Sequence, residues 1–224
     1  LLPPYLSTLM NYPVLTIGLV LAPRGVGTMF SMMVVGRLLG RIDARWPILV
    51  GMALMVVSLH GMTQFGPNAS MHSIIWLGVI QGMGLGLVFV PISTVAYATL
   101  EPPQRTEAAG LFSLVRNIGS SVGISVVMTM LSRAMQVNHA EIGARIPAFG
   151  AETTLLPAAM NPSTATGLAL LNAEVNRQAA AIGYLNDFKL MMLLTLVSMP
   201  LVLLMRGGKA PSGGNAGADA AAAH

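Results

Sequence analysis

Five stretches of this chain stay apolar for about twenty residues or longer. The hydrocarbon core of a bilayer is about 30 Å thick, so roughly 20 apolar residues in a helix can cross it. A helix also satisfies its own backbone hydrogen bonds, which lipid cannot do. The stretches therefore predict an all-α membrane protein with complete transmembrane helices at residues 14–39, 46–64, 71–99, 107–132 and 185–205.

The composition agrees with this class and excludes others. Only 9% of the 224 residues are charged and 54% are hydrophobic, whereas soluble domains carry about 25% charged residues. With no cysteine, disulfides and thiolate chemistry are excluded. The basic residues are scattered, which argues against nucleic acid as a partner, and the four histidines lack ligand spacing. The expected partner is the lipid bilayer, with no metal and no cofactor.

The chain opens on residues 1–11, which are apolar but too short to span a bilayer. They run into Asn11-Tyr12-Pro13, a turn sequence, and the first residue is not methionine. We expect a truncated sixth helix here, because no positive n-region or cleavage site supports a signal peptide. Residues 1–206 form the predicted bundle, and the Gly/Ala-rich residues 207–224 a disordered cytoplasmic tail.

The loop charges predict an orientation in the inner (plasma) membrane. The connection at 36–45 holds three arginines, and short basic loops lie in the cytoplasm. The connection at 65–70 has no basic residue, so it is expected on the outer side. Because successive connections alternate between the two sides, residues 137–184 are expected as a long outer loop. Within it, Gly167–Gly183 has helical spacing. It forms either a separate amphipathic helix at the outer mouth or an extension of the last span.

A few polar side chains interrupt the predicted spans. A charge at bilayer depth costs roughly 3 kcal/mol, so each is a candidate for the substrate or proton pathway. Thr28 follows Arg24 by one helical turn, and Asn117 flanks Arg116. Gln81 is the third polar landmark. The alternative is that both arginines reach an interface or bond backbone carbonyls and only fix helix positions.

A glycine repeat and two acidic residues are expected to have structural roles. Gly78, Gly82 and Gly86 repeat every four residues, a pattern that lets a neighbouring helix approach closely. Glu107 and Asp187 are expected as solvated acids at helix N-termini rather than proton carriers.

One motif points to a different function class. Residues 119–123, GSSVG, match the nucleophile-elbow pattern, which requires a strand-turn-helix context. An intramembrane serine protease using Ser121 therefore stays an alternative, as does a non-transporting membrane scaffold subunit.

Three runs of sequence carry a family resemblance. They read GLVLAPRGVGT at 18–28 followed by GRL at 36–38, IQGMGLG at 80–86 followed by PIST at 91–94, and RTEAAGLFSLVRNIG at 105–119. In this order the runs resemble the C-terminal half of fourteen-helix drug:proton antiporters of the EmrB/QacA type, in the major facilitator superfamily. The resemblance extends to about residue 206.

The resemblance implies a proton-coupled exporter of hydrophobic or amphiphilic compounds rather than an enzyme. Such a protein works by alternating access between two halves, so an N-terminal half with the main proton-binding acids is expected outside this chain. It also implies a cytoplasmic gating loop, here Arg37, Arg41, Asp43 and Arg45. The family's loop aspartate falls at Gly40, three residues before Asp43, which leaves the gating role of this acid open. Some relatives use a periplasmic membrane-fusion adaptor, whose expected contact is Gly167–Gly183.

Overall fold

The computed structural model describes residues 1–39, 41–66, 69–97, 104–145 and 164–204. These residues form helices and connecting turns, with no strand among them. The helices are α1 (Leu2–Thr8), α2 (Val14–Leu38), α3 (Arg45–Met62), α4 (Met71–Tyr97), α5 (Gln104–Arg145) and α6 (Ala165–Leu204). All but α1 are long and apolar enough to cross a membrane. The predicted all-α membrane fold is confirmed.

The short helix α1 and the turn after it follow from local sequence. Pro3 lies in the first turn of α1, where a missing N–H breaks no helical bond. Asn11 adopts a positive φ of 52°, a conformation that asparagine tolerates better than most residues. Pro13 caps α2 in an extended conformation. The predicted turn at Asn11-Tyr12-Pro13 therefore reverses the chain between α1 and α2.

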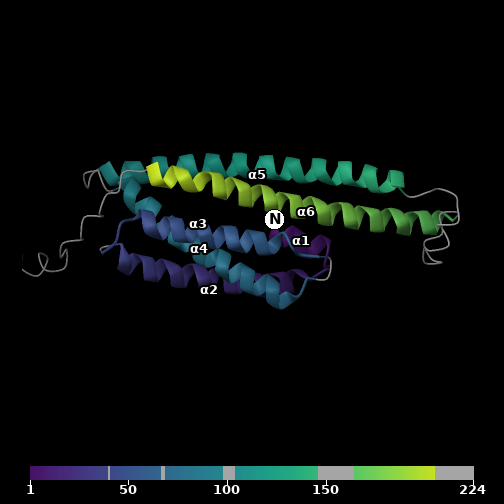
Figure 1. Cartoon of the computed structure of the whole chain (residues 1–224), viewed down its shortest axis with the longest axis horizontal. Coiled ribbons are helices and arrows are strands. Elements are labelled where there is room, and N and C mark those ends of the chain that lie inside the picture. Colours follow the sequence, from purple (N-terminus) through teal and green to yellow (C-terminus); the bar gives the residue numbers. More distant parts are fainter. Residues whose placement is uncertain (40, 67–68, 98–103, 146–163, 205–224) are drawn as a thin grey trace, which may run out of the picture.

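The helices form two groups that lie along one another (Figure 1). Helix α4 packs between α2 and α3, and α6 joins this group through α3. Helix α5 packs along α6 and touches the first group only sparsely, at α4. The result is a bundle with α5 on its outside.

Glycines set the distance between α4 and its neighbours. A Cβ added at Gly82 would collide with the Arg24 carbonyl of α2, and one at Gly84 would lie 2.6 Å from the Gly51 carbonyl of α3. A Cβ added at Gly86 would lie 2.7 Å from the Thr28 carbonyl. The glycine stripe therefore lets helix backbones meet, as its spacing predicted.

An aromatic cluster joins α1 to α6 at one end of the bundle. The Tyr5 ring packs edge-on against Tyr184 and Phe188 of α6, with centroids 5.6 and 6.2 Å apart. Its ring also stacks on Phe65, and its hydroxyl donates to the Gly66 carbonyl at 3.1 Å. Aromatic pairs in these arrangements are favourable beyond the area they bury. This cluster fixes α1 against α6.

The outer segment differs from the sequence-based prediction. Residues 137–184 were expected as a loop, but α5 continues to Arg145 and α6 already begins at Ala165. Of the two alternatives for Gly167–Gly183, the structure has the extension of the last span. The helix continues because Val175 and Ala179 bury one face, and His139 bonds Asn172 across the hairpin at 2.9 Å. At 40 residues, α6 is about 60 Å long, twice the hydrocarbon thickness.

The other predicted spans agree with the structure within a few residues at each described end. The predicted disordered tail at 207–224 and Gly40 lie outside the described residues.

Candidate functional site

Arg24 lies in the interior of α2, ten residues after the helix begins. Its side chain is half-buried, its carbonyl faces Gly82 of α4, and its Cβ faces Gly78 of the same helix. In the described part of the chain the ion pair is that of Arg177 with Glu174, so Arg24 has no acidic partner there. A cation at this depth without a counter-ion needs a partner from outside the described residues.

Thr28 and Ser31 share the face of α2 that carries Arg24, as the helical spacing predicted. The Thr28 hydroxyl donates to the Arg24 carbonyl at 3.0 Å, and the Ser31 hydroxyl donates to the Thr28 carbonyl at 3.0 Å. Both hydroxyls lie in the contact with α4, next to Gly82 and Gly86. Thr28 therefore lies in the helix packing rather than in an open cavity.

Gln81 lies on α4, between the two glycines that contact Arg24. Its side chain is 7% exposed, and its Oε1 is buried without a hydrogen-bond partner. An unpaired buried acceptor costs free energy, so a donor that visits this position would be stabilised. Gln81 is thus placed to bind a donor group between helices.

Arg116 and Asn117 lie on α5, and both side chains are exposed. The Arg116 guanidinium lies over the Phe89 ring of α4, with Cζ 5.4 Å from the centroid, a cation–π contact. The Asn117 carbonyl accepts bonds from the hydroxyls of Ser120 and Ser121, each at 2.9 Å. The structure does not bring Arg116 into contact with Arg24.

Ser121 lacks the structural context that the protease alternative needs. Ser121 lies in the middle of α5, on an exposed face, and its hydroxyl is bonded to its own helix. A nucleophile elbow requires a sharp turn between a strand and a helix.

The predicted gating loop connects α2 to α3. Arg37 lies in the last turn of α2, where a cation interacts favourably with the helix dipole. Arg37, Arg41 and Asp43 are exposed, whereas Arg45 is half-buried with Nε unpaired. This arrangement leaves three charged side chains free to contact a partner on the same side of the membrane.

Asp187 is the residue that sequence reasoning placed wrongly. It was expected as a solvated acid at a helix N-terminus, but α6 begins 22 residues earlier, and Asp187 is only 2% exposed. Its Oδ2 is buried without a hydrogen-bond partner. The signal in the sequence is the spacing, since Val175, Ala179, Gly183 and Asp187 follow one another by one helical turn. Asp187 therefore shares the buried face of α6.

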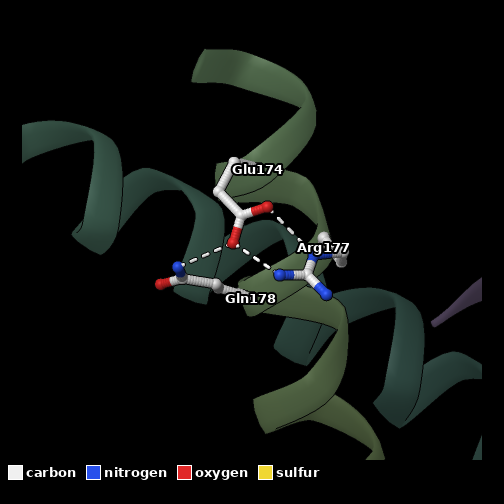
Figure 2. Close-up of polar contacts among 3 residues, drawn as sticks. All are labelled: Glu174, Arg177 and Gln178. Carbon is white, nitrogen blue, oxygen red and sulfur yellow. Dashed lines mark hydrogen bonds and ion pairs between the residues drawn. The ribbon is translucent and has the colours of Figure 1, made fainter. Parts of the chain in front are cut away.

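The charged residues of the outer half of α6 pair with one another instead (Figure 2). Glu174 accepts two bonds from Arg177, each 2.9 Å long, and one from Gln178 at 3.0 Å. An exposed pair of this spacing stabilises a helix by about 0.2–0.5 kcal/mol. The pair therefore stabilises the N-terminal half of α6 from within the helix.

Comparison with known proteins decides the family. Residues 1–135 match the sequence profile of the Major Facilitator Superfamily, which is more than half of the chain. The chain belongs to the major facilitator superfamily.

Individual members of the superfamily show the same relationship. The fatty acid resistance protein FarB of Neisseria gonorrhoeae is 26% identical over 209 residues, which cover 92% of this chain and 41% of FarB. A multidrug resistance protein B homolog of Mycobacterium tuberculosis (strain H37Rv) is 32% identical over 145 residues, 63% of this chain and 26% of the relative. The multidrug export protein EmrB of Escherichia coli K12 is 25% identical over 150 residues, 66% of this chain and 29% of EmrB.

The chain thus spans less than half the length of these curated relatives. Membership of the superfamily and five apolar helices of spanning length make it a multi-pass membrane protein. It is related to membrane transporters rather than to enzymes.

Proposed function

We propose that this chain is the C-terminal half of a proton-coupled exporter of hydrophobic or amphiphilic compounds in the inner membrane. The observation that carries the proposal is Arg24, a half-buried cation in the interior of α2 without an acidic partner in the described residues. The names of the relatives, which refer to fatty acid and multidrug resistance, support the class of substrate.

The surface of the bundle supports a second half. Helix α5 packs on α6, yet its most apolar stretch has no buried residue. Contiguous apolar surface of this kind lies against lipid or protein. In alternating access two halves rock against each other around a site at their interface, and α5 offers such a surface.

Arg24 acts electrostatically in this proposal. A buried cation lowers the pKa of a nearby acid, so Arg24 holds an acid of the other half ionised until substrate or a proton displaces the contact. Gln81, on the adjacent helix, offers its unpaired Oε1 to a donor group of the substrate. Arg37, Arg41, Asp43 and Arg45 form the cytoplasmic gating loop.

The test is dye efflux by the full natural gene product in proteoliposomes. We expect an imposed pH gradient to drive efflux, and Arg24→Ala to abolish this dependence because the acid loses its cation. Arg177→Ala is the matched control, since Arg177 is exposed and pairs within α6. Unchanged efflux and pH dependence in Arg24→Ala would rule out the role of Arg24. A wild type that moves no dye would favour the scaffold alternative.

The outer hairpin is the proposed contact for a periplasmic adaptor. The segment Gly167–Gly183 continues α6 beyond the length that a bilayer needs. Residues such as Asn172 and Arg177 leave polar side chains on its exposed side. Loss of adaptor co-purification after substitution of this exposed side, with efflux into proteoliposomes retained, is the expected result.

A further inference from the structure

A cavity of about 480 Å³ lies between α5 and α6, and most of its lining is apolar. Four polar side chains interrupt this apolar lining: Arg133 and Asn138 from α5, and Asn186 and Asp187 from α6. All four lie in the interior of their helices.

Two buried polar atoms of this cavity lack hydrogen-bond partners. They are Oδ2 of Asp187, an acceptor, and Nδ2 of Asn138, a donor. Among the acidic residues whose side chains the structure describes, Asp187 alone is buried. A buried carboxylate without donors is costly, and binding a proton removes the charge. Oδ2 is therefore a position at which a proton or a hydrogen-bond donor would be stabilised.

The charged surroundings do not supply a permanent partner. No ion pair with Asp187 occurs within the described residues. Arg133 lines the same cavity, Lys189 on α6 is exposed, and His60 on α3 is exposed and contacts Gln64. Other titratable groups on these helices include Arg24 of α2, Tyr5 of α1, Tyr184 of α6 and His139 of α5, whose ring bonds Asn172, and Glu174 of α6 pairs with Arg177.

We propose that Asp187 is a proton-binding site of the transporter, and that the cavity between α5 and α6 connects it to water on the outer side. A hydronium ion in the cavity transfers a proton to Oδ2, forming the carboxylic acid O–H bond and leaving a water molecule. Release reverses this step. The inference rests on the proposed proton-coupled export, because it names where that proton binds.

The first measurement detects the proton itself. Infrared spectra of the purified full-length protein in lipid are recorded as the pH is changed, and the C=O stretch of protonated carboxyl groups is followed. We expect a band in the wild type that Asp187→Asn lacks and Glu174→Gln keeps. Glu174 is the matched control, since it lies on the same helix and is paired with Arg177. A band unchanged by Asp187→Asn overturns the proposal.

The second measurement tests coupling. Asparagine mimics the neutral acid, so Asp187→Asn should keep substrate exchange at equal pH and lose the acceleration of efflux by a pH gradient. Full acceleration in this variant overturns the proposal while the export function stands. If the wild type shows no efflux, the export function fails and the infrared band still decides the proton site.

A third variant tests the proposal if Asp187→Asn misfolds. If Asp187→Asn does not accumulate, Asp187→Glu retains the carboxyl group and should shift the frequency of the band. A band at the wild-type frequency would then assign it to another acid and overturn the proposal.

Discussion

At the scale of single residues, the contacts of α4 depend on glycines that leave no space for a side chain. Backbone meets backbone at Gly82 and Gly84, whereas the two atoms nearest to a Cβ at Gly183 of α6 belong to the flexible side chains of Met135 and Leu131, and the Leu131 carbonyl lies at an ordinary contact distance of 3.7 Å. Protein interiors respond to a single added methyl group when the neighbouring atoms cannot move.

Gly84→Ala should therefore destabilise the protein more than Gly183→Ala does. The new Cβ at Gly84 would lie 2.6 Å from the Gly51 carbonyl, and separating the helices should cost about 1–3 kcal/mol. At Gly183 the nearest atom is Met135 Cγ at 3.2 Å, which can rotate away. Thermal unfolding in detergent measures the difference. Equal midpoints for the two variants would contradict the close contact between α3 and α4.

Ser58 provides a second residue-scale prediction. Its side chain is fully buried, and its hydroxyl donates to the Leu77 carbonyl of α4 at 2.7 Å. Interhelical hydrogen bonds in membrane proteins contribute about 0.6 kcal/mol on average, so Ser58→Ala should lower the unfolding midpoint slightly. Ser198→Ala is the control, because that exposed hydroxyl bonds its own helix at Leu194. A midpoint for Ser58→Ala as high as that of the control would show that this bond adds no stability.

At the scale of elements, α5 and α6 form a helical hairpin longer than a bilayer requires. In the N-terminal half of α6, Val175, Ala179 and Gly183 bury one side of the helix, while Leu168 and Leu170 stay exposed. The bond between His139 and Asn172 joins the two helices in this region. Periodicity revealed the helix, but its continuity with the last span depends on this packing against α5.

A pair of engineered cysteines tests the hairpin. The 224 residues contain no cysteine. The double variant His139→Cys with Asn172→Cys therefore introduces the only two cysteines among them. Because the two side chains meet at their tips, with 2.9 Å between His139 Nε2 and Asn172 Oδ1, we expect rapid cross-linking by a short bifunctional thiol reagent that bridges the space the two side chains filled. Glu141→Cys with Asn172→Cys is the control, since Glu141 is exposed two residues further along. Equal cross-linking of both pairs would mean that the hairpin lacks this fixed register.

At the scale of the whole molecule, the bundle exposes more apolar surface than a water-soluble protein does. Large apolar side chains are exposed along α2 and α5, including Phe30 and Leu111. Lipid covers part of such a surface in a multi-pass protein. The rest is available to the second half that the proposed exporter requires.

The intact mass of the natural gene product, extracted from its own membranes, tests this requirement. We expect a species near twice the 23.4 kDa of this chain, because two halves form one transporter. Mass spectrometry in detergent gives the answer directly. A stable species of 23.4 kDa would require a separate partner half, and if no partner co-purified, the scaffold alternative would replace the exporter.

The sequence by itself determined the membrane class, the number of long helices, the approximate bounds of α2, α3 and α4, and the close-packing glycines. These properties depend on local length, hydrophobicity and spacing, which each segment carries alone. Only the tertiary structure decided that Asp187 is buried, that Thr28 lies in a helix contact and that Arg116 is exposed. Burial is set by which distant helix packs against a face, and the same residue pattern permits either outcome until that neighbour is in place.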